Sequence, residues 1–70
     1  MTTERDRKLG KRVQKARKKA GLTQEKLAET VKLSTKYIQF IESGKRTPSL
    51  KTVYKIGRAL NIKVQDLFPF

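Results

Sequence analysis

Apolar residues recur along the chain at the spacing of α-helices. In the first segment Leu9, Val13, Ala16 and Ala20 follow one another at intervals of four, three and four residues, which places them on one face of a helix. The sequence nowhere alternates strictly between apolar and polar residues over the length of a strand. The pattern therefore predicts an all-α fold.

Two helices are predicted in the first half of the chain. The first covers about residues 4–20 and is followed by Gly21, which suits a left-handed C-terminal cap. The second begins at Thr23, whose hydroxyl can accept a hydrogen bond from a backbone N–H of the first turn. Its inward stripe consists of Leu27, Ala28 and Val31.

A third helix is predicted over residues 35–43, between a Ser34 cap and Gly44. It separates into two faces, because residues three and four apart lie side by side on a helix. The apolar face holds Tyr37, Ile38 and Ile41. The opposite face holds Lys36, Gln39, Phe40 and Ser43.

The fourth helix has two candidate starting points. Thr47 can cap a helix whose first residue is Pro48, and Ser49 is an equally good cap. The helix ends at Asn61, a residue that tolerates the left-handed conformation. Its inward residues are expected to be Leu50, Val53, Ile56, Gly57 and Leu60, with Gly57 allowing close packing. A last short helix is expected near residues 63–68, stopped by Pro69.

Length and composition fit one small domain. The chain has 70 residues, of which 36% are hydrophobic, enough for a single core of marginal stability. Residues 1–7 are expected to form a basic N-terminal arm or the start of the first helix, and residues 8–70 the domain. No apolar run approaches the length of a membrane span, and the N-terminus lacks the apolar stretch of a signal peptide.

The charge is strongly positive. Eighteen Lys and Arg against six Asp and Glu give a net charge of +12. A basic surface can serve solubility alone, but repulsion on this scale destabilises a compact chain and favours a polyanionic partner.

The missing residue types exclude most catalytic chemistry. The sequence has no Cys and no His, which removes disulfides, zinc fingers and thiol or imidazole catalysis. Glu25 and Glu29, four residues apart, can share a helix face and are interpreted as a solvated flank rather than an acid–base pair. No glycine-rich phosphate loop is present. We therefore expect no enzyme, no cofactor and no metal site.

Two short helices joined by a tight turn, the second and third in order, form a helix-turn-helix pattern. The second helix of such a pair buries one stripe and leaves a face free for the major groove. The free face here contains no acid, as a base-reading face requires. Its residues are Thr35, Lys36, Gln39, Phe40 and Ser43.

Residues 21–49, GLTQEKLAETVKLSTKYIQFIESGKRTPS, resemble the lambda-repressor/Cro-type helix-turn-helix family, often called XRE-like. The landmarks are LTQ at 22–24, LA at 27–28, Ser34, Ile38, IESGKR at 41–46 and PSL at 48–50. With its flanking helices the resemblance covers about residues 8–68. It implies a compact five-helix DNA-binding domain with the second and third helices as the helix-turn-helix.

The resemblance also assigns roles to single residues. Base readout is expected from Thr35, Lys36, Gln39 and Phe40, where Lys36 suits guanine, Gln39 adenine and an exposed Phe40 thymine methyls. For Phe40 a place in the core is an equal alternative.

Phosphate contacts are expected from Gln24, Ser43, Lys45, Arg46 and Thr47. Thr47 and Ser49 can instead serve as helix caps. The resemblance makes Arg17 and Glu42 a structural ion pair between the first and third helices.

Two positions depart from the family's pattern. Lys32 stands where relatives commonly carry Gly in the turn, so the turn is expected to be reshaped or stabilised differently. Lys63 replaces the usual small cap before the last helix, which is expected to fray.

The function implied is sequence-specific binding of double-stranded DNA by a small cytoplasmic transcriptional regulator of prokaryotic or phage type, most simply a repressor on a palindromic operator. An antitoxin with a toxin partner, a restriction controller, and a non-specific nucleic-acid or interaction module are the alternatives. The resemblance implies a homodimer through the C-terminal helices. The apolar residues there either close the core or, where exposed, form a dimer surface: Ile62, Val64, Leu67, Phe68 and Phe70. A membrane partner is not expected, since the stripe of the first helix is short and suits packing in a bundle.

Overall fold

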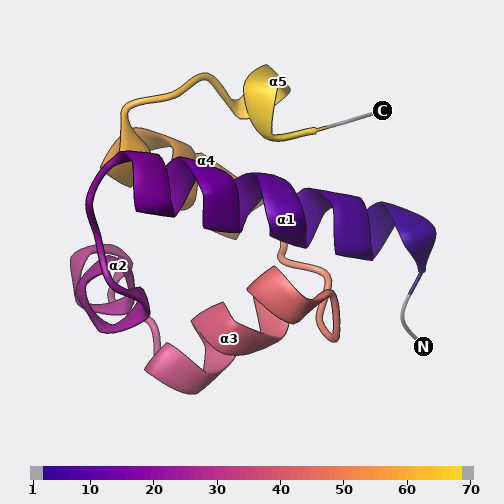
Figure 1. Ribbon diagram of the computed structural model, residues 1–70, viewed down its shortest axis with the longest axis horizontal. Helices are drawn as coiled ribbons and strands as arrows, with labels where there is room; N and C mark the ends of the chain where they lie inside the picture. Colours follow the sequence, from indigo (N-terminus) through magenta and orange to yellow (C-terminus); the bar gives the residue numbers. More distant parts are fainter. Residues whose placement is uncertain (1–2, 69–70) are drawn as a thin grey trace.

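The computed structural model describes residues 3–68, and five α-helices account for most of them (Figure 1). No residue of this range lies in a strand. The helices are α1 (Glu4–Lys19), α2 (Gln24–Val31), α3 (Thr35–Ser43), α4 (Leu50–Leu60) and α5 (Val64–Leu67). The predicted all-α fold with five helices is confirmed, and residues 4–7 form the first turn of α1.

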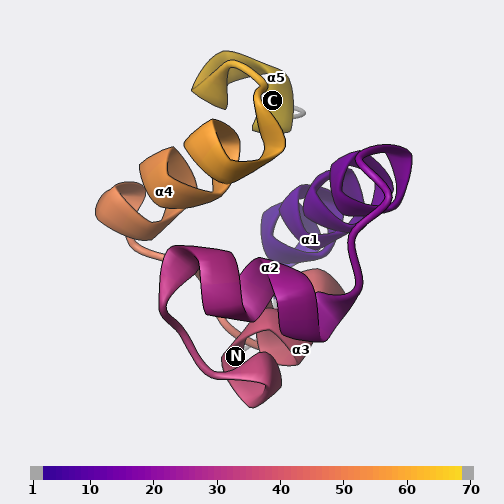
Figure 2. The ribbon, with the colours of Figure 1, turned by 90° about the vertical axis from the view of Figure 1, so that its left-hand side faces the viewer.

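The longest helix, α1, is the centre of the arrangement. In Figure 1 it runs between α3 on one side and α5 on the other, with α4 behind it. Figure 2 shows α2 lying across α3 and beside α4. The described chain measures 26 × 23 × 20 Å. In so small a body α1 can contact α3, α4 and α5 at once.

Apolar side chains from all five helices form one core. Its buried members are Leu9, Val13, Leu27, Ala28, Val31, Ile38, Ile41, Val53, Ile56, Leu60 and Leu67. The expectation that Leu50 points inward is wrong, because 60% of its surface is exposed. Leu50 occupies the first position of α4, one turn outside the buried stripe that starts at Val53, and the buried Pro48 precedes it.

Hydroxyl caps fix where the helices begin. The Thr23 side chain accepts from the backbone N–H of Lys26, and the Ser34 side chain accepts from that of Tyr37. At α4 the cap is Ser49, so the alternative start at Pro48 does not occur. Each cap satisfies a backbone donor that has no partner within its own helix.

In the turn between α2 and α3 the residue that ends α2 has the left-handed conformation, although it is not a glycine. Lys32 adopts φ 59° and ψ 45°, and its N–H donates to the carbonyl of Glu29 at 3.2 Å. The expectation of a reshaped turn is therefore wrong: the Lys accepts the strained conformation, which costs a non-Gly residue about 1–3 kcal/mol. Lys63 makes no side-chain cap, and α5 is only four residues long.

Gly10 allows α1 and α3 to approach closely. A Cβ at this position would meet the carbonyl oxygen of Ile41 and would lie 2.6 Å from that of Glu42. Both oxygens belong to the backbone of α3, so neither can move without shifting the helix. Gly57 is less tight, since a Cβ there would lie 3.2 Å from the carbonyl oxygen of Ile62.

We expect Gly10→Ala to lower the free energy of unfolding by about 1–3 kcal/mol, because the added methyl forces α1 away from α3. The better helix propensity of Ala, about 1 kcal/mol, offsets only part of that loss. Thermal unfolding measures the change, and Gly57→Ala is the matched control with a smaller expected loss. Equal melting of wild type and Gly10→Ala would contradict the close approach.

Candidate nucleic-acid interface

The third helix presents a free face and a buried stripe, as the sequence predicts. Ile38, Ile41 and Glu42 are buried. On the opposite side Lys36, Gln39 and Ser43 are exposed, while Thr35 and Phe40 are half-buried. The free face carries no acid, because the only acid of α3 is the buried Glu42.

Phe40 lies at the edge of this face beside Lys36. The Lys36 ammonium nitrogen lies 5.9 Å from the centre of the Phe40 ring, a distance that allows a weak cation–π attraction. Tyr37 packs against the core cluster, whereas Phe40 is not among the side chains that do so. The half-exposed ring and the ammonium group therefore form one surface on α3.

The loop after α3 is folded back onto the end of the helix. The backbone N–H groups of Lys45 and Arg46 both donate to the carbonyl of Phe40, at 2.9 and 3.3 Å. Gly44 makes this possible with φ 82°. The Ser43 hydroxyl donates to the same carbonyl at 3.2 Å. The side chains of Lys45 and Arg46 are left exposed next to the free face of α3.

Thr47 is held by a residue that the sequence analysis did not single out. Its hydroxyl donates to an Asp6 carboxylate oxygen at 2.6 Å, which ties the loop to the first turn of α1. This hydrogen bond is the main reason that the pKa of Asp6 is lowered. The other Asp6 oxygen accepts from the Thr3 backbone in a capping box. The Thr-x-x-acid spacing of residues 3–6 is the sequence signal for the box, but not for the bond to Thr47.

Because the pKa of Asp6 is lowered, its ionised form stabilises this junction. The contribution is fully present above the ordinary pKa of an aspartate. This stabilisation by Asp6 is lost as the pH falls from the ordinary pKa of an aspartate through the lowered pKa of Asp6. The loop is thus held at neutral pH.

A buried ion pair joins α1 to α3. The Arg17 guanidinium donates through Nε to one Glu42 oxygen at 2.6 Å and through Nη2 to the other at 3.2 Å. The side chains are 9% and 2% exposed. Arg17 also donates through Nη1 to the carbonyl of Leu22 at 2.6 Å. The contact between Arg17 and Glu42 is the one that the family resemblance implies.

Gln24 belongs to the same network. Its amide nitrogen donates to Glu42 at 3.0 Å. An amide nitrogen carries two hydrogens, so one remains for an acceptor outside the protein. The buried carboxylate therefore orients the side chain at the N-terminus of α2, where backbone N–H groups favour anions.

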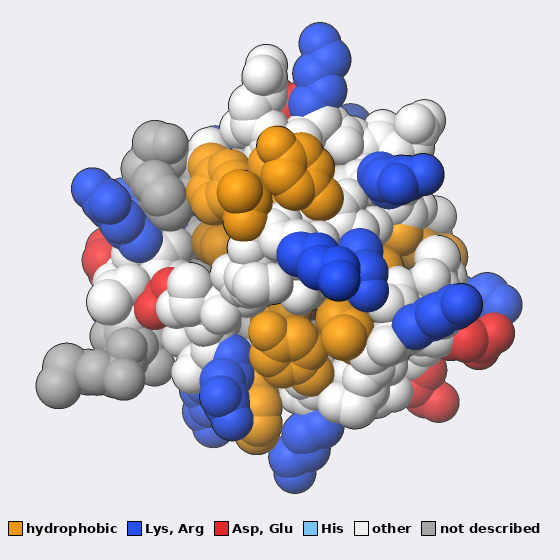
Figure 3. Space-filling view, turned by 180° about the vertical axis from the view of Figure 1, so that it is seen from behind, with side chains coloured by type: hydrophobic (Ala, Val, Ile, Leu, Met, Phe, Trp, Pro, Cys, Tyr) orange, Lys and Arg blue, Asp and Glu red, His pale blue; other side chains and the backbone are white. Residues whose placement is uncertain are grey.

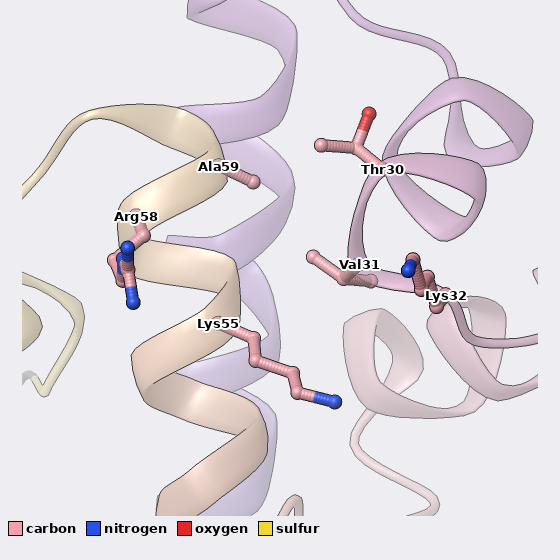
Figure 4. Close-up of a pocket in the computed structure, with 6 residues that line it drawn as sticks. All are labelled: Thr30, Val31, Lys32, Lys55, Arg58 and Ala59. Carbon is pink, nitrogen blue, oxygen red and sulfur yellow. The ribbon is translucent and has the colours of Figure 1, made fainter.

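A concave region lies between α2 and α4, and none of its lining residues belongs to α3. Figure 4 shows Val31 pointing toward α4 and Lys55 reaching from α4 toward α2. The cleft has a volume of about 400 Å³ and carries three cations and no acid among its lining residues, which are Thr30, Val31, Lys32, Lys55, Arg58 and Ala59.

Residues 3–68 hold neither a metal-binding cluster nor a membrane span. This part of the chain contains no group of three or more Asp, Glu, His or Cys side chains placed to hold a metal ion. None of its helices is both long and apolar enough to cross a membrane.

We expect Glu42→Ala to lower the free energy of unfolding by about 3–5 kcal/mol, because Arg17 would be left buried without its counter-charge. A chain of this size has a total free energy of unfolding of only about 4–10 kcal/mol. The variant should therefore lose stability first and binding affinity second. Thermal or urea unfolding measures the loss of stability.

Two further variants make that test specific. Glu25→Ala removes an equal charge from an exposed position and should melt like the wild type. The double variant Arg17→Met with Glu42→Leu should recover much of the loss, since apolar replacement of both partners removes the uncompensated charge. Normal melting of Glu42→Ala would show that the pair contributes nothing.

Comparisons with known proteins agree with this geometry. The helix-turn-helix family model matches residues 13–67. An uncharacterized HTH-type transcriptional regulator of Archaeoglobus fulgidus is 46% identical over 59 residues, which is 84% of each chain.

Solved structures agree as well. The restriction-modification controller protein C.AhdI of Aeromonas hydrophila is 37% identical with a TM-score of 0.86, over 89% of this chain and 94% of that one. The biofilm master regulator SinR in complex with DNA is 28% identical with a TM-score of 0.80, over 84% and 95%. The chain belongs to the XRE-like helix-turn-helix family of DNA-binding transcriptional regulators.

Proposed function

We propose that this protein is a small transcriptional regulator that binds double-stranded DNA with α3 in the major groove. The observation that carries the proposal is the acid-free exposed face of α3 on a chain of net charge +12. A groove lined by phosphates attracts such a face, and its polar side chains can read base edges. Repression is the simplest action, because a bound protein of this size blocks access to a promoter.

Base readout is assigned to Thr35, Lys36, Gln39 and Phe40. The exposed Lys36 and Gln39 can donate to guanine and adenine in the major groove. The Phe40 ring, beside the Lys36 ammonium group, presents an apolar surface to a thymine methyl. These four positions lie on the first two turns of α3.

Phosphate contacts are assigned to Gln24, Lys45 and Arg46, and of the five residues predicted for this role Ser43 and Thr47 support the loop. Lys45 and Arg46 are exposed cations on a loop whose backbone is fixed by hydrogen bonds. Gln24 keeps one amide hydrogen for a phosphate. Thr47 and Ser43 already donate their hydroxyl hydrogens within the protein, so their part is to hold the loop in position.

A homodimer is proposed through the last two helices, with α4 as its main surface. Figure 3 shows this side of the molecule, where small groups of hydrophobic side chains are separated by Lys and Arg. The exposed large apolar residues of the described chain are Leu50 and Tyr54, 60% and 53% exposed and four residues apart on α4. At the C-terminal end Leu67 is buried, and Ile62, Val64 and Phe68 pack on the core. Phe70 lies outside the described residues.

Control of a restriction–modification system is a second candidate. It is favoured by the likeness to the controller protein C.AhdI, which extends over 89% of this chain. Both readings require the same DNA-binding surface in the cytoplasm and differ in the gene controlled. A toxin or another protein partner is a further proposal, for which α4 is again the available apolar surface.

Selection from a random pool of duplex DNA at near-physiological salt tests the proposed function. We expect an enriched palindrome whose half-sites lie about one turn of DNA apart, about 34–36 Å. Lys36→Ala and Gln39→Ala should each relax the preference at one position of the half-site, by about 1–3 kcal/mol of discrimination. Arg46→Ala should instead weaken binding to all sequences alike.

The outcomes of that selection separate the readings. Enrichment of a single half-site would support sequence-specific DNA binding and would contradict the homodimer. A pool that stays random, with binding that disappears as salt rises, would reject sequence-specific regulation and leave only attraction between charges.

The contact between Asp6 and Thr47 gives a further expectation. Asp6→Ala and Thr47→Val should each weaken DNA binding several-fold, because the loop carrying Lys45 and Arg46 would no longer be held against α1. Electrophoretic mobility shifts with the selected operator measure the effect.

Glu4→Ala is the matched control for charge. It also removes an acid from the first turn of α1, where Glu4 pairs with Arg7 at 2.8 Å and not with the loop. It should leave affinity unchanged or raise it. Stronger binding by Asp6→Ala would show that the carboxylate acts only through its charge.

A further inference from the structure

The cleft between α2 and α4 is lined by cations from both helices. Lys32 is the residue that ends α2, and Lys55 and Arg58 belong to α4. Figure 4 shows Lys55 reaching from α4 toward the end of α2, where Lys32 lies. Because like charges without a counter-charge repel one another, this arrangement favours an anion between the two helices.

No acid within residues 3–68 supplies that anion. None of the residues that line the cleft is an acid, and none of its three cations belongs to an ion pair of the described chain. Glu29, the nearest acid along α2, pairs with Lys26 at 3.7 Å and does not line the cleft. The helix α4 contains no Asp or Glu. The counter-charge is therefore left to solvent ions or to a binding partner.

The backbone of Lys32 gives an independent indication. Its φ of 59° lies in the left-handed region, where a side chain is strained and glycine is not. Asn61 is the other described non-glycine residue with positive φ, and Asn adopts this conformation readily. Strain of this kind clusters at functional sites. The Lys32 side chain lines the cleft, so the cleft is where its function is to be sought.

The floor of the cleft is apolar. Val31 is only 4% exposed, and Ala59 is half-buried. The volume of about 400 Å³ lies within the range of binding sites, about 300–1,000 Å³. An apolar floor between cations suits a segment that carries an aliphatic side chain between carboxylates, because each part meets its complement. A row of DNA phosphates would leave the floor uncovered.

We propose that the cleft between α2 and α4 binds an acidic segment of a partner protein, with carboxylates on Lys32 and Lys55 and an aliphatic side chain on the floor. The inference goes beyond DNA binding and does not depend on it, since no residue of α3 lines the cleft. The proposed dimer surface is also separate, because Lys55 follows Tyr54 by one position, about 100° around the helix axis. Lys32 precedes α3 by only a short turn, so a bound partner would contact the helix-turn-helix itself.

Selection from short random peptides displayed on phage tests the proposal. Near-physiological salt screens diffuse attraction between charges. For the wild type we expect enrichment of peptides in which carboxylates flank an aliphatic residue. The affinity of one enriched peptide is then measured by fluorescence anisotropy for the wild type and for each variant.

Two double variants of equal charge separate the cleft from the net charge. In the first, Lys32→Asn keeps a residue that tolerates the left-handed conformation, and Lys55→Gln removes the facing cation. Its peptide affinity should fall by up to about fivefold for each cation removed. In the second, Lys11→Gln with Lys15→Gln removes as many cations from exposed positions of α1. This control should bind the peptide nearly as well as the wild type.

Two single variants test the floor and the strain. Ala59→Leu fills the floor without changing the charge and should also weaken peptide binding. Lys32→Gly removes the strain together with the cation, so it should melt no lower than the wild type and yet bind the peptide more weakly. A purely structural Lys32 predicts the opposite, a loss of stability. Thermal melting verifies folding, and the double variants decide the matter if Ala59→Leu does not fold.

Three results would overturn the proposal. The first is that the wild type enriches no peptide of the expected kind. The second is that both double variants lose peptide affinity alike, which would leave only net charge. The third is that the cleft variant keeps its peptide affinity but loses affinity for duplex DNA, or loses self-association in sedimentation. That result would assign the cleft to the phosphate backbone or to a second copy of the chain. Failure of the proposed function looks different, since it would leave the peptide results unchanged.

Discussion

The buried pair of Arg17 and Glu42 is the constraint on which the positions of three helices depend. It joins α1 to α3 by two hydrogen bonds, reaches the start of α2 through the carbonyl of Leu22, and orients Gln24. Removing two charges from water is costly, and the geometry must be good for the pair to offset that cost. The network meets this condition, since no buried polar side-chain atom of the described residues lacks a partner.

The same pair explains why a glycine is needed where α1 packs against α3. Gly10 brings the backbone of α1 against the carbonyl groups of Ile41 and Glu42, which keeps Arg17, two turns farther along α1, within reach of the Glu42 carboxylate. Gly44 then lets the chain turn back against Arg7. The free face of α3 and the loop after it are thus positioned by contacts on the opposite side of the helix, where no DNA would reach.

Sequence patterns were sufficient for the helices, because these depend on local rules, whereas the ion pair between α1 and α3 was implied only by the family resemblance. Spacing fixed the buried stripes, and hydroxyl residues fixed the caps at Thr23 and Ser34. Leu50 was placed wrongly, since periodicity cannot say where along a helix the core ends. Asp6 was missed as a partner of Thr47, because two residues separated by 41 positions meet only through the tertiary packing of α1 on α3. The roles of the DNA-facing residues stay predictions.

The charge distribution connects stability to binding. The acids of the described chain are used locally, in a helix cap, a buried pair and the flank of α2, so most cations of the surface have no counter-charge. A domain with this imbalance is destabilised by its own repulsion. A polyanion that contacts the folded arrangement better than the unfolded chain removes that repulsion and stabilises the fold. The backbone of the loop that carries Lys45 and Arg46 is held by hydrogen bonds to the end of α3 and, through Thr47, to α1. A phosphate can therefore be bound by a loop whose backbone is already ordered, which reduces the entropy cost of binding.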